Sequence, residues 1–412
     1  MNSIDRVIFK LIGGSVKKSG SKLIFFGQLF ASFFSLISVA LTANYVGPEI
    51  FAFCSIAVTI QILYMSMVDF GACAWAAREL ASKNISDKIF IDVMNVKLKT
   101  NLIPTFISPL VYYLLPETYS WVALLCFYPM LWNYYNFIQQ FLIVKGLIGK
   151  SVQLVIIERF CWFTIIPLQS INADLSFSFV FPIISGLILH AVIGRNYLKK
   201  FQDSSNSKAR TNREIFRESR HFGFINLFAV LSNIDGLLVA FFTDLSNSGS
   251  YIMAQRFRTP LTLIFQSIAT RIKPIAATRE SELIKNALKT DMSFLILGIV
   301  GNVFLSILSF LWSDQFLGSS FENIGLIMFI ASLTSIPFGI TLVASSILSA
   351  MHFEKLMALI NGYYTFFLIV GVSSFAYFQG ALGAVFWVFT QTLVVSIFLS
   401  MKLFRELKFQ ST

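Results

Sequence analysis

Three charged residues lie inside two otherwise apolar stretches of the sequence: Asp235, Arg256 and Arg258. An ionised side chain at the centre of a bilayer costs about 2.5–3.5 kcal/mol on insertion scales, so such residues usually face a cavity or a charged partner. Counted inward from helix ends expected at Thr243 and Ser250, Asp235 and Arg258 lie at the same depth, about 12 Å. The spacing therefore predicts a structural pair between Asp235 and Arg258. Arg256, about 200° around the helix from Arg258, is predicted to project into a polar lumen.

Three further charges fall within apolar segments. Asp69 lies within about two turns of the expected inner boundary and is interpreted as a structural charge, with ion coupling as the alternative. Glu158 and Arg159 are adjacent and point about 100° apart, so one can line a lumen while the other meets a neighbouring helix. A guanidinium binds phosphate oxygens in a forked geometry, which makes Arg159 a candidate phosphate ligand. Pairing of Arg159 with an acid is the alternative.

An amide face is predicted in the segment WNYYNFIQQF. Asn133, Asn136 and Gln140 are spaced i, i+3 and i+7, which places them within about 60° of one another on a helix. Amides on one face bind sugar hydroxyls or form hydrogen bonds between helices, and the spacing leaves both roles open.

The amino-acid composition indicates whether these helices lie in water or in a membrane. Of 412 residues, 56% are hydrophobic and only 13% are charged, whereas soluble domains carry about a quarter charged residues. The chain is therefore predicted to be an integral membrane protein. The four cysteines and three histidines lack disulfide or metal-ligand spacing, so no metal site and no cofactor are predicted. No glycine-rich phosphate loop or nucleophile elbow occurs, which argues against an enzyme.

Runs of about 20 apolar residues predict twelve membrane-spanning helices. They lie near 23–44, 50–74, 100–115, 120–141, 152–170, 177–194, 222–243, 250–270, 292–313, 324–348, 357–377 and 381–401. All of the 32 Lys and Arg residues except Arg159, Arg256 and Arg258 then fall at one side. Since basic residues are retained in cytoplasmic loops, both termini are predicted to be cytoplasmic.

The longest polar stretch, 195–221, divides the predicted spans six and six, as expected of a linker between two repeated lobes. The predicted fold is an all-α membrane protein of twelve transmembrane helices in two six-helix lobes around a central lumen. Its predicted parts are a cytoplasmic N-terminal segment (1–22), an N-lobe (23–194), the linker (195–221), a C-lobe (222–401) and a cytoplasmic tail (402–412).

Several short motifs resemble the Wzx-type polysaccharide flippases of the multidrug/oligosaccharidyl-lipid/polysaccharide exporter (MOP) superfamily. The first half carries Gly47-Pro48-Glu49, Asp69-Phe70-Gly71 and Arg78-Glu79 with Ala81. The second half carries Asp235, Gly249, Tyr251, Arg256 and Pro274, and GALGAVFWVFTQTLVV at 380–395 resembles the last helix.

The resemblance implies flipping of a polyprenyl-diphosphate-linked oligosaccharide from the inner to the outer leaflet of the bacterial inner membrane, for O-antigen or capsule assembly. With it, Arg256 and Arg159 become candidate diphosphate ligands, and Asn133, Asn136 and Gln140 candidate sugar ligands. The expected partners are the lipid-linked glycan, membrane lipids, and polysaccharide polymerase and chain-length proteins, with no nucleic acid. The alternative is an ion-coupled small-solute antiporter of the multidrug type, and coupling to H⁺ or Na⁺ is left open.

Overall fold

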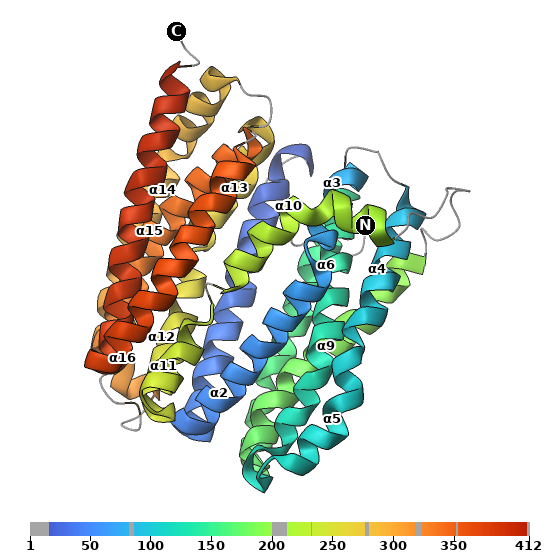
Figure 1. Ribbon diagram of the computed structural model, residues 1–412, viewed down its shortest axis with the longest axis vertical. Helices are drawn as coiled ribbons and strands as arrows, with labels where there is room; N and C mark the ends of the chain where they lie inside the picture. Colours follow the sequence, from blue (N-terminus) through green and yellow to red (C-terminus); the bar gives the residue numbers. More distant parts are fainter. Residues whose placement is uncertain are drawn as a thin grey trace. The chain divides into compact units, whose positions relative to one another are not determined.

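The computed structural model describes residues 16–81, 86–199, 212–231, 233–276, 280–317, 321, 324–351 and 353–409. Within this part the chain is almost entirely helical and contains no strand (Figure 1). The predicted all-helical class is confirmed for these residues. Of the predicted N-terminal segment, linker and tail, residues 1–15, 200–211 and 410–412 lie outside the described part.

Six helical segments in the described part are long and apolar enough to cross a membrane. The twelve predicted segments lie mainly on helices, but the structure joins some of them and divides others. Helix α2 (Val16–Asp69) runs through the first two, with a non-helical residue at Gly47 (φ 79°). Helix α16 (Glu354–Phe409) runs through the last two, with a similar interruption at Gly380 (φ 64°). A glycine at each interruption is expected, because only glycine adopts positive φ without steric cost.

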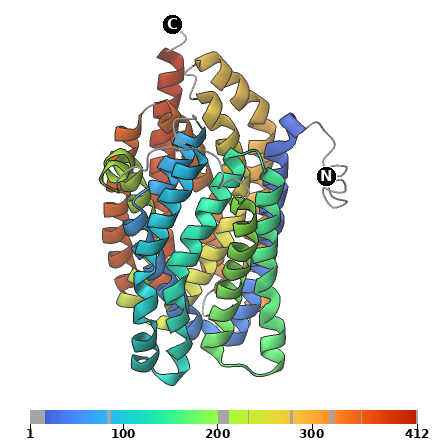
Figure 2. The ribbon, with the colours of Figure 1, turned by 90° about the vertical axis from the view of Figure 1, so that its right-hand side faces the viewer.

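The described residues group into two compact units. Unit 1 consists mainly of residues 53–233 together with 37–46. Its helices after α2 are α3 (Ala72–Ala81), α4 (Asp87–Asn101), α5 (Ile103–Leu114), η1 (Glu117–Phe127), α6 (Tyr128–Val144), α7 (Ile148–Phe160), η2 (Cys161–Thr164), α8 (Ile165–Ser170), α9 (Leu175–Leu198) and α10 (Asn212–Leu231). Helices α4, α6 and α9 run alongside one another in both views (Figures 1 and 2), and α9 packs against η1, α6 and α7.

Unit 2 consists mainly of residues 234–412, with 16–36 and 47–52 from α2. Its other helices are α11 (Asp235–Phe242), α12 (Leu245–Leu261), α13 (Leu263–Ala276), α14 (Ser281–Leu317), α15 (Ile324–Ala350) and α16. Helix α15 packs against α12, α13, α14 and α16 (Figure 1). The boundary between the units falls at 233/234, after α10, whereas the sequence placed a linker at 195–221. Residues 212–221 of that linker are the first part of α10.

Each unit has its own apolar core. In unit 1 the largest fully buried members include Trp75, Phe90, Phe137 and Phe141, and the Phe90 ring lies 5.5 Å from that of Phe137 in an edge-on arrangement. In unit 2, Phe265 is fully buried with aliphatic side chains of α13, α15 and α16. In a membrane such cores are held by close packing, since lipid tails are as apolar as the side chains.

Helix α14 presents a long apolar face that the other described residues leave uncovered. Its exposed side chains include Met292, Ile296, Leu297, Val300, Val303, Phe304, Ile307, Leu311 and Trp312. Only 17% of the most apolar stretch of this helix is buried inside the protein. This composition is that of a helix surrounded by lipid.

Candidate functional site

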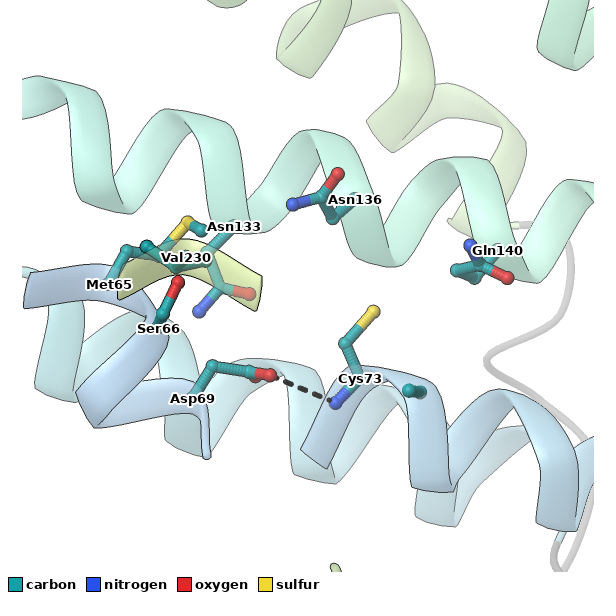
Figure 3. A pocket seen from close by; sticks show the side chains of 9 residues that line it. Met65, Ser66, Asp69, Cys73, Asn133, Asn136, Gln140 and Val230 are labelled. Carbon is teal, nitrogen blue, oxygen red and sulfur yellow. Dashed lines mark hydrogen bonds between the residues drawn. The ribbon is translucent and has the colours of Figure 1, made fainter. Parts of the chain in front are cut away.

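A cavity of about 270 Å³, with several polar side chains in its lining, lies within unit 1 (Figure 3). Four helices contribute to it: α2, α3, α6 and α10. Its lining residues are Met65, Ser66, Asp69, Cys73, Ala74, Asn133, Asn136, Gln140 and Val230. The cavity therefore brings together one charge and the three amides that sequence reasoning had singled out separately.

Asp69 reaches the cavity because a helix breaks directly after it. Helix α2 ends at Asp69, and the next two residues have positive φ, 44° at Phe70 and 74° at Gly71. Helix α3 then starts at Ala72, and the Cys73 N–H donates to Oδ2 of Asp69 over 3.4 Å. Asp69 therefore caps the N-terminus of α3, where the helix dipole favours a negative charge. Its other oxygen, Oδ1, is buried and has no hydrogen-bond partner among the described residues.

The same break holds α10 close to the cavity. A Cβ atom added to Gly71 would lie 2.5 Å from the backbone nitrogen of Gly223, and one added to Gly223 would lie 2.4 Å from the Phe70 ring. The Phe70 ring also meets that of Phe224 edge-on, at 5.5 Å between centroids. Val230, two turns further along α10, lines the cavity. The Asp69-Phe70-Gly71 motif thus ends α2, starts α3 and seats α10.

The three predicted amides of α6 all line the cavity, and their exposure increases along the helix. Asn133 is only 2% exposed, Asn136 is half-buried and Gln140 is exposed. The Nδ2 atom of Asn133 has no hydrogen-bond partner in the described part of the chain. In Figure 3 the Asn133 amide extends from α6 toward Ser66 and Asp69. The amide face therefore has a buried donor without a partner at Asn133 and a solvent-accessible amide at Gln140.

Gln139, next to Gln140, points away and takes part in a different network. Its side chain accepts from the Ser151 hydroxyl and lies 3.4 Å from Nε2 of His190. His190 is fully buried, and its ring lies 4.3 Å from that of Tyr135. These contacts join α6 to α7 and α9, so this amide stabilises helix packing.

Glu158 and Arg159 do not face separate surroundings as the sequence predicted. The Nε atom of Arg159 lies 3.1 Å from Oε2 of Glu158, and the Trp162 indole donates to Oε1 over 3.2 Å. The Arg159 guanidinium also lies over the Trp162 ring, at 4.9 Å. A long side chain can bend around the helix to reach its neighbour, which the 100° separation of Cα–Cβ directions did not take into account. The structure thus shows the alternative arrangement, an ion pair with an acid.

In unit 2, Asp235 is bonded by Tyr251. The Tyr251 hydroxyl donates to Oδ2 of Asp235 over 2.6 Å, and the Gly236 N–H donates to Oδ1 over 2.9 Å. Arg258 instead lies with its guanidinium over the ring of Phe338, at 5.0 Å. Within the described residues no ion pair joins Asp235 to Arg258. Arg256, predicted to face a lumen, is exposed.

The outer turn is shorter than the sequence predicted, which changes the residues of α12 that lie level with Asp235. Helix α11 ends at Phe242 and α12 begins at Leu245, so SNSGS is the first part of a helix and not a loop. This shift places Asp235 level with residues near 251 and 252 of α12. The close approach of Ile252 to Gly236 and the hydrogen bond from the Ser248 hydroxyl to the Gly236 carbonyl, 2.9 Å, show this register.

Two of the short motifs that carry the sequence resemblance also meet in unit 2. A Cβ atom added to Gly249 would lie 2.4 Å from the carbonyl oxygen of Pro48. Gly47-Pro48-Glu49 forms the turn in α2, and Gly249 lies in the second turn of α12. The glycine at 249 therefore allows the turn of α2 to pack closely on α12.

Sequence reasoning missed the small and apolar members of the cavity and the partner of Asp235. Ser66 lies one turn before Asp69 on α2, so helical spacing could have found it, whereas Cys73 follows the helix break at Phe70 and Gly71. Val230 comes from a distant helix, and no sequence signal placed it here. Tyr251 belongs to one of the sequence motifs, but the predicted loop boundary separates it from Asp235.

The comparisons with known proteins agree with this arrangement. A family model described as polysaccharide biosynthesis protein matches residues 18–275. The chain belongs to this family, within the MOP superfamily. No curated protein matches the sequence.

Solved structures with the same fold are MATE proteins and other MOP-superfamily transporters. One is a MOP-superfamily transporter from Pyrococcus furiosus, with a TM-score of 0.69, 12% identity and coverage of 98% of both chains. A second is a multidrug resistance MATE family transporter in an outward-facing conformation, with a TM-score of 0.68, 11% identity and coverage of 98% of both chains. A third is a MATE protein in a bent conformation, with a TM-score of 0.66, 13% identity and coverage of 98% of this chain and 99% of the other.

The polysaccharide biosynthesis family match includes every candidate residue of both units, from Asp69 to Arg258. Together with its apolar helices, family membership identifies the chain as a multi-pass membrane protein with a MATE-like fold. At identities of 11–13% the solved structures establish the fold alone.

Proposed function

We propose that this member of the polysaccharide biosynthesis family is a flippase that moves a polyprenyl-diphosphate-linked oligosaccharide from the inner to the outer leaflet of the bacterial inner membrane. The product would serve O-antigen or capsule assembly. The observation that carries the proposal is the cavity lined by Asn133, Asn136 and Gln140 in a chain of this family. A sugar headgroup cannot cross hydrocarbon without such groups, because each unsatisfied polar group costs several kcal/mol there.

The proposed architecture is twelve spans in two six-helix lobes with both termini in the cytoplasm. It is supported by the distribution of Lys and Arg, which avoids every loop assigned to the outside. Reporter fusions after Asn206 and at the C-terminus are expected to report the cytoplasm, and a fusion at Asp244 the outside. An outside signal at the C-terminus would contradict twelve spans.

The proposed ligands have different chemistry. Amides on α6 would bind sugar hydroxyls, and Arg256, which is exposed, would bind the diphosphate through its forked donors. Arg159 is neutralised by Glu158 in this structure, so it would bind phosphate only after that pair separates. The proposed partners are the lipid-linked glycan, surrounding lipids, and the polymerase and chain-length proteins that act on the exported unit.

The decisive experiment is deletion of the gene followed by two measurements, surface glycan and lipid-linked glycan retained at the inner leaflet. Deletion is expected to remove the first and accumulate the second, and the wild-type gene to restore both. Asn133→Ala and Asn136→Ala should reduce export while membrane abundance stays near normal. Gln153→Ala is the matched control, because that amide lies on α7 outside the cavity. A fall in abundance that matches the fall in export would assign the amides to packing.

A second candidate is an ion-coupled multidrug-type antiporter, with coupling to H⁺ or Na⁺. It is favoured by the likeness in fold to a multidrug resistance MATE family transporter. The same deletion strain separates the two. Increased drug susceptibility with normal surface glycan would favour the antiporter, and lost glycan with unchanged susceptibility would favour the flippase.

A further inference from the structure

Two buried polar atoms in the unit 1 cavity lack hydrogen-bond partners among the described residues, and their chemistry is opposite. Oδ1 of Asp69 can only accept a hydrogen bond while the side chain is ionised, and Nδ2 of Asn133 can only donate one. The two side chains are 8% and 2% exposed. Buried polar groups are nearly always satisfied by protein, water or a ligand, so two unsatisfied atoms on residues that line one cavity can serve a hydrogen-bonding group that enters it.

Helix capping does not account for the Asp69 carboxylate. Capping uses Oδ2, which accepts from the Cys73 N–H. Ser, Thr or Asn caps a helix about as well as Asp and without a buried charge. The nearby Lys97 ammonium donates to the Val68 carbonyl over 2.9 Å, and Oδ1 of Asp69 has no hydrogen-bond partner among the described residues. The second carboxylate oxygen is therefore available for another group.

A hydroxyl matches this pair of atoms, since one hydroxyl can donate to the carboxylate and accept from the amide at the same time. The cavity of about 270 Å³ is far larger than the space of about 10–15 Å³ that a single water requires. It lies just below the range of about 300–1,000 Å³ that is usual for small-molecule sites. One sugar ring fits this volume, and a whole oligosaccharide does not.

We propose that Asp69 and Asn133 form a clamp for a hydroxyl group of one sugar ring in the transported glycan. The inference rests on the proposed flippase function and names the part of the substrate that enters this cavity. Asn136 and Gln140, further along α6, would contact the next hydroxyls toward the exposed end. Carbohydrate recognition by a carboxylate and an amide would then make Asp69 a ligand and not an ion-coupling group.

Cys73 supplies a reporter for the clamp. Its thiol lines the cavity and points toward α6 (Figure 3). Cys161 is a matched control, because it is also partly exposed but lies outside the cavity. Two proteins with a single cysteine each, one keeping Cys73 and the other Cys161, are compared in native membranes by their rates of modification with a methanethiosulfonate reagent.

The membranes come from two strains, one that makes the lipid-linked glycan and one without the sugar-phosphate transferase that starts its assembly. The glycan is expected to slow modification of Cys73 severalfold and to leave Cys161 unchanged. Loss of one charge-assisted hydrogen bond should weaken binding about tenfold or more, so Asp69→Asn should remove the protection. Asn133→Ala provides a second variant if Asp69→Asn does not reach the membrane.

Other outcomes would overturn the clamp. Equal modification of Cys73 in the two strains, with export still lost on deletion, would leave the flippase standing and show that no sugar enters this cavity. Protection of Cys73 by Na⁺ relative to choline in glycan-free membranes would show a cation site. If deletion itself leaves surface glycan unchanged, the flippase proposal fails independently of the clamp.

Discussion

Asp69 in unit 1 and Asp235 in unit 2 are both buried aspartates beside a helix end, yet their carboxylates are bonded very differently. Both oxygens of Asp235 accept hydrogen bonds, from Tyr251 at 2.6 Å and from Gly236 at 2.9 Å. Asp69 lines a cavity and accepts from the Cys73 N–H at 3.4 Å, while its Oδ1 is buried without a partner among the described residues. Burial alone therefore does not distinguish a binding residue from a structural one. A carboxylate oxygen without a hydrogen-bond partner is the feature that distinguishes them.

The largest expected effect removes the geometry that exposes Asp69 to the cavity. Gly71→Ala introduces a Cβ at φ 74° and 2.5 Å from the backbone of α10. The conformation costs about 1–3 kcal/mol and moving a packed backbone costs a similar amount. We expect little folded protein in the membrane, measured by abundance and by monodisperse elution in detergent.

Gly146→Ala is the matched control for that change. It has nearly the same φ, 72°, but an added Cβ meets nothing within 4 Å. It should show the conformational cost without the clash. Equal damage from both substitutions would mean that the approach of Gly71 to Gly223 contributes nothing.

The next effect concerns Glu158, a third buried acid, which is 1% exposed and neutralised by its neighbour. Arg159→Gln leaves that charge without its cation, which typically costs about 3–5 kcal/mol. The thermal unfolding midpoint should fall, and Glu158→Gln in the same protein should restore most of it. A normal midpoint combined with lost glycan export would assign Arg159 to the substrate instead.

A smaller loss is expected from Tyr251→Phe. The substitution leaves one Asp235 oxygen buried without its donor, at a cost of about 1–3 kcal/mol. Asp69→Asn should lower the unfolding midpoint less than Tyr251→Phe, because asparagine keeps an oxygen that can accept from the Cys73 N–H. The comparison between the two aspartates fails if Asp69→Asn destabilises the protein as much as Tyr251→Phe.

Tyr45→Phe is the control for loss of a tyrosine hydroxyl. The Tyr45 hydroxyl donates to the Ala173 carbonyl over 3.2 Å in a partly exposed position. Water can replace that bond, so the midpoint should change less than in Tyr251→Phe.

The smallest effect is expected at Asp244, an exposed aspartate before α12. It accepts from the Asn247 N–H at 2.7 Å and from its side-chain amide at 2.8 Å. These bonds lower the pKa of Asp244 below its ordinary value, so its contribution to stability is present above about pH 4 and is lost as the pH falls further. Asp244→Ala should cost about 0.5–1 kcal/mol at neutral pH. The difference from wild type should shrink in unfolding curves measured at lower pH, and a constant difference would contradict the capping role.

Much of this arrangement followed from the sequence. Apolar runs predicted a helical membrane protein, and the spacing of Asn133, Asn136 and Gln140 placed the three amides on one face. Local pattern was sufficient there because helical periodicity fixes which side chains share a face.

The failures have a common physical origin in helix boundaries and side-chain reach. SNSGS has the composition of a loop, but tertiary packing against Pro48 and Gly236 keeps it helical. Because the predicted helix began too late, the sequence indicated Arg258 as the partner of Asp235, whereas the structure shows Tyr251. The ion pair of Glu158 with Arg159 was missed because the direction of a Cα–Cβ bond does not fix the position of a long side chain. The contribution of Val230 to the cavity depends on contact between distant helices, which a single sequence does not encode locally.

The length of the exposed apolar face of α14 determines the hydrocarbon thickness that suits this protein. From Met292 to Trp312 the face extends about 30 Å at 1.5 Å per residue, close to the thickness of an ordinary hydrocarbon core. Exposed Lys289 lies just beyond one end, and the Trp312 indole at the other end suits the headgroup region. Short-chain lipids would leave part of this stripe in contact with water unless the bilayer thickened around it or the helix tilted. The acyl-chain length of a reconstitution mixture is therefore a property to which this protein should be sensitive, independently of any headgroup.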